Sequence, residues 1–263
     1  MNISCKGALI DLSTPKVMGI LNLTPDSFYD GGIYNDNYRA LKQAEKMLNE
    51  GATFIGVGGA SSNPGAKPVL IEEELKRVIP TIEKINKTFP EAIISIDTYN
   101  SEVAKQAVLA GASMVNDISA GNLDTNMMGI VGALGVPFVA MHMQGNPINM
   151  QINPTYKNVL VELRYFFSLK ISQAHNAGIN DIILDPGFGF GKTIEHNYTI
   201  LRNLQTLQME SAPLLIGLSR KSMIYKLLNI DASNSLNGTT SLNTVALING
   251  AHILRVHDVK EAV

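Results

Sequence analysis

Short apolar runs alternate with longer amphipathic stretches along the whole chain. The apolar runs predict buried strands. These strands are expected at 17–22, 54–57, 93–96, 114–116, 137–141, 182–185, 214–217 and 252–256. The stretches between them have apolar residues at helical spacing and predict helices. The helices are expected at 37–49, 71–88, 101–109, 126–134, 155–177, 195–207, 221–228 and 240–249, with a last one starting near 258.

Eight strands of the buried type with helices between them predict an α/β protein, a single (β/α)8 TIM barrel that occupies residues 1–263 as one domain. No linker or low-complexity tract interrupts the pattern. An open doubly wound sheet is the alternative, because the number of strands is difficult to read from a sequence.

Composition narrows the function classes. The 263 residues include 21 Lys and Arg against 23 Asp and Glu, a net charge of −2, which argues against a nucleic-acid partner. A single cysteine, Cys5, excludes an intrachain disulfide and a cysteine zinc site. The N-terminus lacks a signal-peptide pattern, and no apolar run could cross a membrane. We therefore expect a cytoplasmic protein without a membrane partner.

Polar side chains follow nearly every predicted strand. In a barrel of this kind, the carboxyl ends of the strands form the active-site mouth. The residues at these ends are Asn22, Asp97, Asn116, Asp117, His142, Asp185, Ser219, Arg220, Lys221, Arg255 and His257. The sequence thus predicts one polar site at that mouth, although His142, without a second histidine nearby, favours a structural role.

The segment 186–193 is rich in glycine and includes Gly191-Lys192-Thr193. A phosphate-binding loop with this ending needs a glycine at position 186. The chain has Pro186 there, so this interpretation is rejected.

Motifs spread in order over almost the whole chain closely resemble those of the dihydropteroate synthase family. They are residues 21–32, 58–65, 95–98, 115–118, 141–145, 184–193, 219–222 and 255–258. The resemblance implies a barrel that joins 6-hydroxymethyl-7,8-dihydropterin pyrophosphate to 4-aminobenzoate, giving 7,8-dihydropteroate and pyrophosphate for folate synthesis. It also implies sulfonamide binding, a homodimer and Mg²⁺ as the cofactor.

The resemblance also assigns roles to individual residues. Those expected to bind the pterin are Asp97, Asn116, Ile118, Met141, Asp185, Gly217 and Lys221. Those expected at the pyrophosphate are Asn22, Ser62, Arg255 and His257, with Asn22 as the metal ligand. The aminobenzoate site is expected to contain Phe28, Ser62, Pro64, Phe190, Lys221 and Ser222. The catalytic residues would be Asp30, Lys221, Arg255 and His257.

The resemblance suits the chemistry. A buried carboxylate can accept from the ring N–H and the exocyclic amine of a pterin together. The aniline nitrogen of aminobenzoate is neutral at pH 7, so the difficult step is departure of pyrophosphate. We expect a dissociative path in which cations stabilise the leaving group and Asp30 stabilises the pterin cation.

Three positions depart from the family pattern: Gly56 replaces an Asp, Ala60 a Glu and Asn63 an Arg. Loss of the arginine is expected to affect substrate affinity and the sulfonamide response more than the reaction type. Two other functions remain open, a pterin-dependent methyltransferase and a non-enzymatic pterin-binding partner of another synthase. The cations expected at the leaving group argue against the first, and only the three replacements support the second.

Overall fold

A computed structural model describes residues 1–24, 32–61, 65–209 and 212–263, and the side chains of 32–37 lie outside this description. Eight parallel strands form one sheet in the order β8–β7–β6–β5–β4–β3–β10–β9. Leu184 at one edge forms a parallel bridge with Leu214 beside the other edge, and its N–H donates to the Pro213 carbonyl at 2.9 Å. The sheet therefore closes on itself, and the predicted (β/α)8 barrel is confirmed.

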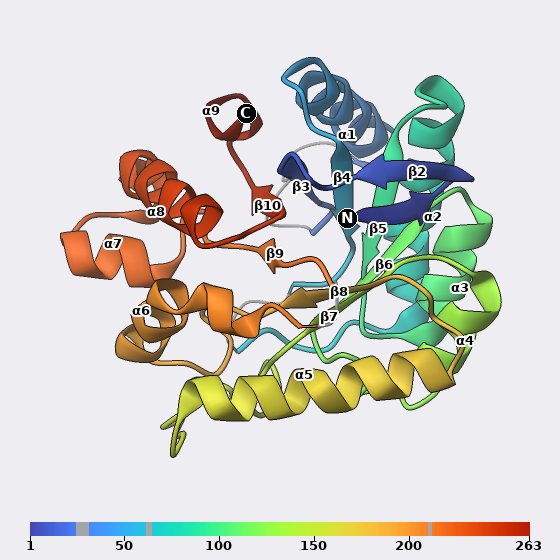
Figure 1. Cartoon of the computed structure of the whole chain (residues 1–263). Coiled ribbons are helices and arrows are strands. Elements are labelled where there is room, and N and C mark those ends of the chain that lie inside the picture. Colours follow the sequence, from blue (N-terminus) through green and yellow to red (C-terminus); the bar gives the residue numbers. More distant parts are fainter. Residues whose placement is uncertain (25–31, 62–64, 210–211) are drawn as a thin grey trace.

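Strands and helices alternate along the barrel (Figure 1). The barrel strands are β3 (Lys16–Asn22), β4 (Phe54–Gly58), β5 (Ile93–Asp97), β6 (Met114–Asp117), β7 (Phe138–Met141), β8 (Ile182–Asp185), β9 (Leu215–Ile216) and β10 (Ile253–Val256). The helices are α1 (Gly32–Asn49), α2 (Ile71–Thr88), α3 (Ser101–Leu109), α4 (Met127–Leu134), α5 (Val159–Asn176), α6 (Ile194–Arg202), α7 (Ser222–Leu228), α8 (Leu236–Ile248) and α9 (Val259–Ala262). No helix in the described part of the chain is both long and apolar enough to cross a bilayer.

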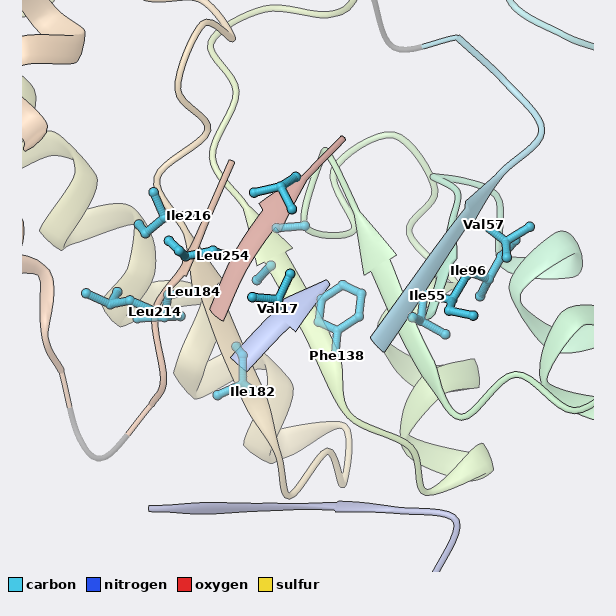
Figure 2. Packing of buried hydrophobic residues seen from close by; sticks show 14 of the residues in the cluster. Val17, Ile55, Val57, Ile96, Phe138, Ile182, Leu184, Leu214, Ile216 and Leu254 are labelled. Atoms are coloured by element: carbon cyan, nitrogen blue, oxygen red, sulfur yellow. The ribbon is translucent and has the colours of Figure 1, made fainter. Parts of the chain in front are cut away.

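Alternation along the strands gives the sheet an outer and an inner face, because successive side chains point to opposite sides. The outward positions pack under the helices in one large apolar cluster, and the side chains labelled in Figure 2 come from the barrel strands and, for Leu214, from the bridge residue before β9. A second cluster takes one buried inward residue from each barrel strand: Met18, Phe54, Ile93, Met114, Val139, Ile183, Leu215 and Ile253. The interior of the barrel is thus packed at its amino-terminal end.

A β-hairpin that the sequence pattern did not predict completes this packing. Strands β1 (Asn2–Cys5) and β2 (Ala8–Asp11) pair antiparallel around a two-residue turn. Both turn residues have positive φ, 51° at Lys6 and 74° at Gly7, as a tight hairpin turn of the primed type requires. Ile3 and Cys5 of the hairpin belong to the interior cluster. The hairpin therefore covers the end of the barrel opposite the carboxyl ends of the strands.

Most predicted helices form, and the differences lie at their ends. Helix α5 begins at Val159 instead of 155, because the Asn158 side chain caps it by accepting from the N–H groups of Leu160 and Val161. The helix predicted over 195–207 ends at Arg202, and a 3-10 turn follows at Leu204–Leu207. The predicted strand at 214–217 is shorter and covers only Leu215–Ile216.

Candidate active site

The inner face of the barrel changes from apolar to polar toward the carboxyl ends of its strands. Counting by twos from the interior cluster leads to Asn22, Gly58, Asp97, Asn116, Met141, Asp185, Gly217 and Arg255, all of which line one cavity. This cavity has a volume of about 640 Å³, part of it open to solvent. Strand periodicity therefore brings residues from all eight strands to one mouth.

The acceptor groups of this cavity lie on β5, β6 and β8, of which β5 and β6 are neighbouring strands. Asn116 Nδ2 donates to Asp97 Oδ1 at 2.8 Å. Asn116 Oδ1 is buried and has no hydrogen-bond partner among the described residues. This pair thus fixes Asp97 and keeps an amide oxygen available to a ligand that donates.

Asp185 is the most buried carboxylate of the cavity, with 6% of the residue exposed. Burial raises the pKa of Asp185, and the positive charge of Lys221 and the N–H of Gly187 oppose that rise. The Gly187 N–H donates to Asp185 Oδ1 at 2.8 Å. A planar ligand with adjacent N–H donors would supply the hydrogen bonds that a buried carboxylate needs.

Cationic groups line the other side of the cavity. Lys221 Nζ lies 4.8 Å from the centre of the Phe190 ring and donates to the Phe188 carbonyl. Burial lowers the pKa of Lys221 to about 8, while Asp185 acts in the opposite direction and Arg255 adds to the lowering. Lys221 therefore carries a charge that a modest rise in pH removes.

Arg255 connects the two sides of the cavity. Its Nη2 forms an ion pair with Asp97 Oδ2, and the two side chains are 23% and 12% exposed. Its Nε is buried without a hydrogen-bond partner in the described structure. The Nε–H group of Arg255 is therefore available to donate to an anion in the mouth.

A second cavity of about 1480 Å³, which includes open solvent, adjoins the first and shares Asn22, Phe190, Gly217, Lys221 and Arg255 with it. Ser222 and His257 line this second cavity. The two cavities therefore form one continuous mouth with a narrow inner part and a wide outer part.

His257 presents a neutral ring to the outer cavity. Ser219 Oγ lies 2.9 Å from His257 Nδ1 and also accepts from the His257 backbone N–H at 3.2 Å. A hydroxyl can both donate and accept, so this contact suits either neutral tautomer of the ring. Burial of the ring and the charge of Arg255 lower the pKa of His257 to about 4. Part of His257 is open to solvent, which weakens the lowering of its pKa. A pKa below the usual value of a histidine still leaves the ring neutral at neutral pH.

Hydrogen bonds and an ion pair of Arg220 hold the loop that carries Lys221. Arg220 has a positive φ of 57° and pairs with both carboxylate oxygens of Asp258 at 2.8 Å. Its Nη1 also donates to the carbonyls of Ala232 and Ser233 at 3.1 and 2.6 Å. The bridge ties the loop after β9 to the residues after β10, so Lys221 and His257 are held relative to each other.

Not every predicted site residue can be placed. Asp30, Phe28, Ser62 and Pro64 lie outside the described residues, as does Asn63. The other predicted site residues all line one cavity or both: Asn22, Asp97, Asn116, Ile118, Met141, Asp185, Phe190, Gly217, Lys221, Ser222, Arg255 and His257.

Two polar residues at strand ends turn away from the mouth. Asp117 is fully buried and accepts from the N–H groups of Ser119 and Gly121, so it holds the loop after β6. His142 is 7% exposed and contacts Lys192 instead of either cavity. The expectation of convergence was wrong for Asp117, because loops after a strand also need acceptors, whereas His142 has the structural position that was favoured for it.

Several lining residues had no predicted role. Thr98 and Tyr99 line the inner cavity directly after Asp97, and their place after a strand end was the available signal. Met150 and Gln151 line the outer cavity from the long loop between β7 and α5. No periodic pattern marks such a loop, so these two could not have been found from spacing.

This chain resembles proteins of known family and structure over its whole length. Residues 18–257 match the family described as pterin binding enzyme. Dihydropteroate synthase of Escherichia coli strain K12 is 47% identical over 265 residues, which cover 100% of this chain and 93% of the relative. The crystal structure of Yersinia pestis dihydropteroate synthase with a sulfonamide drug complex has a TM-score of 0.94 and 43% identity, covering 100% of this chain and 95% of that one. Dihydropteroate synthase from Xanthomonas albilineans in complex with 7,8-dihydropteroate gives 0.89 and 36%, with coverage of 100% and 95%.

The chain therefore belongs to the pterin-binding enzyme family, and within it to the dihydropteroate synthases, which are transferases.

Proposed function

We propose that this chain condenses 6-hydroxymethyl-7,8-dihydropterin pyrophosphate with 4-aminobenzoate to give 7,8-dihydropteroate and pyrophosphate. The observation that carries the proposal is the division of one mouth into an acceptor side, Asp97, Asn116 and Asp185, and a donor side, Lys221, Arg255 and His257. A flat heterocycle rich in N–H groups fits the first side, and a pyrophosphate fits the second.

The pterin would enter the inner cavity. Its ring N–H and exocyclic amine would donate to Asp185, while Asn116 Oδ1 offers a further buried acceptor. At Asp97 the pterin would compete with Arg255, which holds that carboxylate in the ligand-free chain. Pterin binding would thus release the guanidinium toward the leaving group.

Departure of pyrophosphate from the pterin CH₂ is the step that needs stabilisation. The guanidinium of Arg255, once released from Asp97, would join the ammonium of Lys221 and the imidazole of His257 at the mouth where negative charge develops. The dihydropterin can delocalise the positive charge left behind, so we infer a dissociative path. The neutral aniline nitrogen then attacks the CH₂ and loses its proton to solvent.

The aminobenzoate would occupy the outer cavity. Phe190 and Lys221 belong to both cavities, and Ser222 lies beside them in the outer one. An aromatic acid could place its ring against Phe190 and its amine toward the inner cavity. Roles for Phe28, Asp30, Ser62 and Pro64 stay predictions.

Mg²⁺ is the proposed cofactor. Asn22 Oδ1 and Asp97 Oδ2 lie 3.6 and 3.8 Å from the point that a Cβ on Gly58 would occupy, so this glycine keeps space open beside two oxygens. The described residues contain no group of three or more His, Cys, Asp or Glu that could hold a metal. A hard cation held by Asn22, pyrophosphate oxygens and water fits this donor set. When bound, the ion would neutralise charge on the leaving pyrophosphate.

Release of pyrophosphate tests the proposal. The purified chain is incubated with both substrates and Mg²⁺, and pyrophosphate and dihydropteroate are quantified together. Equal amounts of the two products are expected. A chain that bound the pterin without releasing pyrophosphate would instead be a methyltransferase or a non-enzymatic partner, and methyl transfer from a folate to a corrinoid would separate these two.

A homodimer, a cytoplasmic location and a single domain over residues 1–263 belong to the same proposal. Sedimentation of the purified chain tests the first of these.

A further inference from the structure

The loop between β8 and α6, residues 187–191, has an unusual set of hydrogen bonds. Each of its backbone carbonyls accepts from a side chain. The donors are Lys192 to Gly187 and Phe190, Lys221 to Phe188, Gln151 to Gly189 and the Tyr156 hydroxyl to Gly191. The loop is therefore fixed by side chains rather than by regular secondary structure.

Lys192 is the buried centre of this arrangement, with only 2% of the residue exposed. Its Nζ donates to the carbonyls of Gly187 and Phe190 at 3.0 Å and of His142 at 3.2 Å, and lies 3.0 Å from His142 Nδ1. Burial holds the pKa of Lys192 well below its usual range. Burying an amine is unfavourable unless its N–H groups donate hydrogen bonds. The contacts of Lys192 tie the loop to itself and to His142, the residue directly after β7.

The loop also packs tightly against the segment after β7. A Cβ on Gly187 would lie 2.0 Å from the His142 carbonyl, and one on Gly191 would lie 2.6 Å from the Gln144 carbonyl. Both glycines have positive φ, 67° and 62°. Only glycine permits this approach, so Lys192, Gly187 and Gly191 together hold one backbone path.

Phe190 belongs to this loop and lines both cavities. Lys221 Nζ sits over its ring at 4.8 Å and bonds the neighbouring Phe188 carbonyl. The position of the loop therefore sets the positions of the Phe190 ring and of the Lys221 ammonium.

We propose that Lys192 is a positioning residue for the aminobenzoate site, acting through Phe190 and without touching substrate. This inference rests on the proposed function. Two pterin acceptors, Asp97 and Asn116, lie on β5 and β6 away from the loop, whereas Asp185 accepts from the N–H of Gly187 at its start. Loss of Lys192 should therefore weaken use of aminobenzoate more than binding of the pterin.

The test uses Lys192→Met, which keeps the length of the side chain and removes its donors. The KM for aminobenzoate should rise by about 10- to 100-fold, as expected when a reacting partner is misplaced, and the pterin Kd should rise by a clearly smaller factor. Lys170→Met is the matched control, because Lys170 is also buried at 6% exposure but donates to Asn122 away from the cavities. It should lower Tm while both constants stay at the parent values.

Two further variants keep the inference falsifiable if Lys192→Met does not fold. Tyr156→Phe removes only the bond to the Gly191 carbonyl and should raise the aminobenzoate KM by about two- to fivefold, the size of one lost hydrogen bond. Phe190→Leu should raise the same KM, and its effect should not multiply with that of Tyr156→Phe or Lys192→Met. Parent-like aminobenzoate KM in folded Lys192→Met, or in Tyr156→Phe where the former does not fold, would overturn the inference. Absence of turnover in the parent itself would instead remove the proposed function, and the inference with it.

Discussion

The two sides of the active-site mouth are built differently. The acceptors Asp97, Asn116 and Asp185 sit on the strands themselves, are nearly buried and are bonded to one another or to backbone. On the donor side only Arg255 sits on a strand, β10, while Lys221 and His257 lie in the loops after β9 and β10, held by Ser219 and the Arg220–Asp258 bridge. Acceptors fixed on strands suit a heterocycle that keeps its shape, while the two donors on braced loops suit an anion that forms and leaves.

Removal of the Arg255 guanidinium should have the largest effect. Arg255→Met should lower turnover by about 10² to 10³, because preorganised donors to developing charge contribute on this scale. Steady-state rates of pyrophosphate release measure the loss. Lys260→Met, a change on the exposed helix α9, is the control and should keep the parent rate. Parent-like turnover of Arg255→Met would remove the leaving-group role.

Neutralising the acceptor side should affect binding before chemistry. Asp185→Asn keeps the shape of the side chain but replaces a charged acceptor with an amide that also donates. Pterin affinity should fall by roughly 30-fold, since charge-assisted hydrogen bonds contribute about 2 kcal/mol. Calorimetric titration with the dihydropterin alcohol provides the measurement. Unchanged affinity would place the heterocycle elsewhere.

The pH dependence of kcat/KM should report the charge of Lys221 on the donor side. Lys221 is charged below its pKa of about 8 and neutral above it, so its contribution is lost as pH rises. Above about pH 8, kcat/KM for the pterin pyrophosphate should fall by about tenfold per pH unit. In Lys221→Met this limb should disappear from a lower starting rate. A limb that survived the substitution would assign it to another group.

Asn22 should matter only when the metal and the pyrophosphate are both present. Asn22→Ala should weaken Mg²⁺-dependent binding of the pterin pyrophosphate by about tenfold, since one oxygen ligand among several is lost. Binding of the pterin alcohol should stay at the parent value, as titrations with and without Mg²⁺ would record. An equal loss for both ligands would argue against a metal role.

The smallest expected effect concerns a departure from the family pattern. Asn63→Arg restores the cation of the family pattern, so the KM for aminobenzoate and the inhibition constant of a sulfonamide should both fall by about two- to fivefold, the scale of an exposed ion pair. Asn63→Gln, which adds length without charge, is the matched control. An unchanged sulfonamide constant in Asn63→Arg would show that this position does not set the drug response.

The strands and the inner polar layer were predictable from local patterns. Apolar runs that end in Asp97, Asn116 or Asp185 are readable residue by residue, because strand periodicity and barrel geometry fix where their ends go. The resemblance of the motifs then assigned roles that periodicity alone could not.

The features that escaped prediction depend on long-range packing. The N-terminal hairpin was missed because Lys6 occupies a positive-φ turn position where Asn or Asp is the usual signal. Lys192 was considered only as part of a phosphate loop, and its contacts with His142 come from a residue 50 positions away. Similarly, Met150 and Gln151 reach the outer cavity from a loop without periodic pattern.

The central claim is that one side of the mouth holds the heterocycle and the other acts on the pyrophosphate. Equilibrium binding of 6-hydroxymethyl-7,8-dihydropterin, which lacks pyrophosphate, to the parent, Asp185→Asn and Arg255→Met chains tests it most directly. The account predicts weakened binding in Asp185→Asn and binding no weaker than the parent in Arg255→Met, because Arg255 competes with the pterin for Asp97. The reverse order would contradict the division of the site.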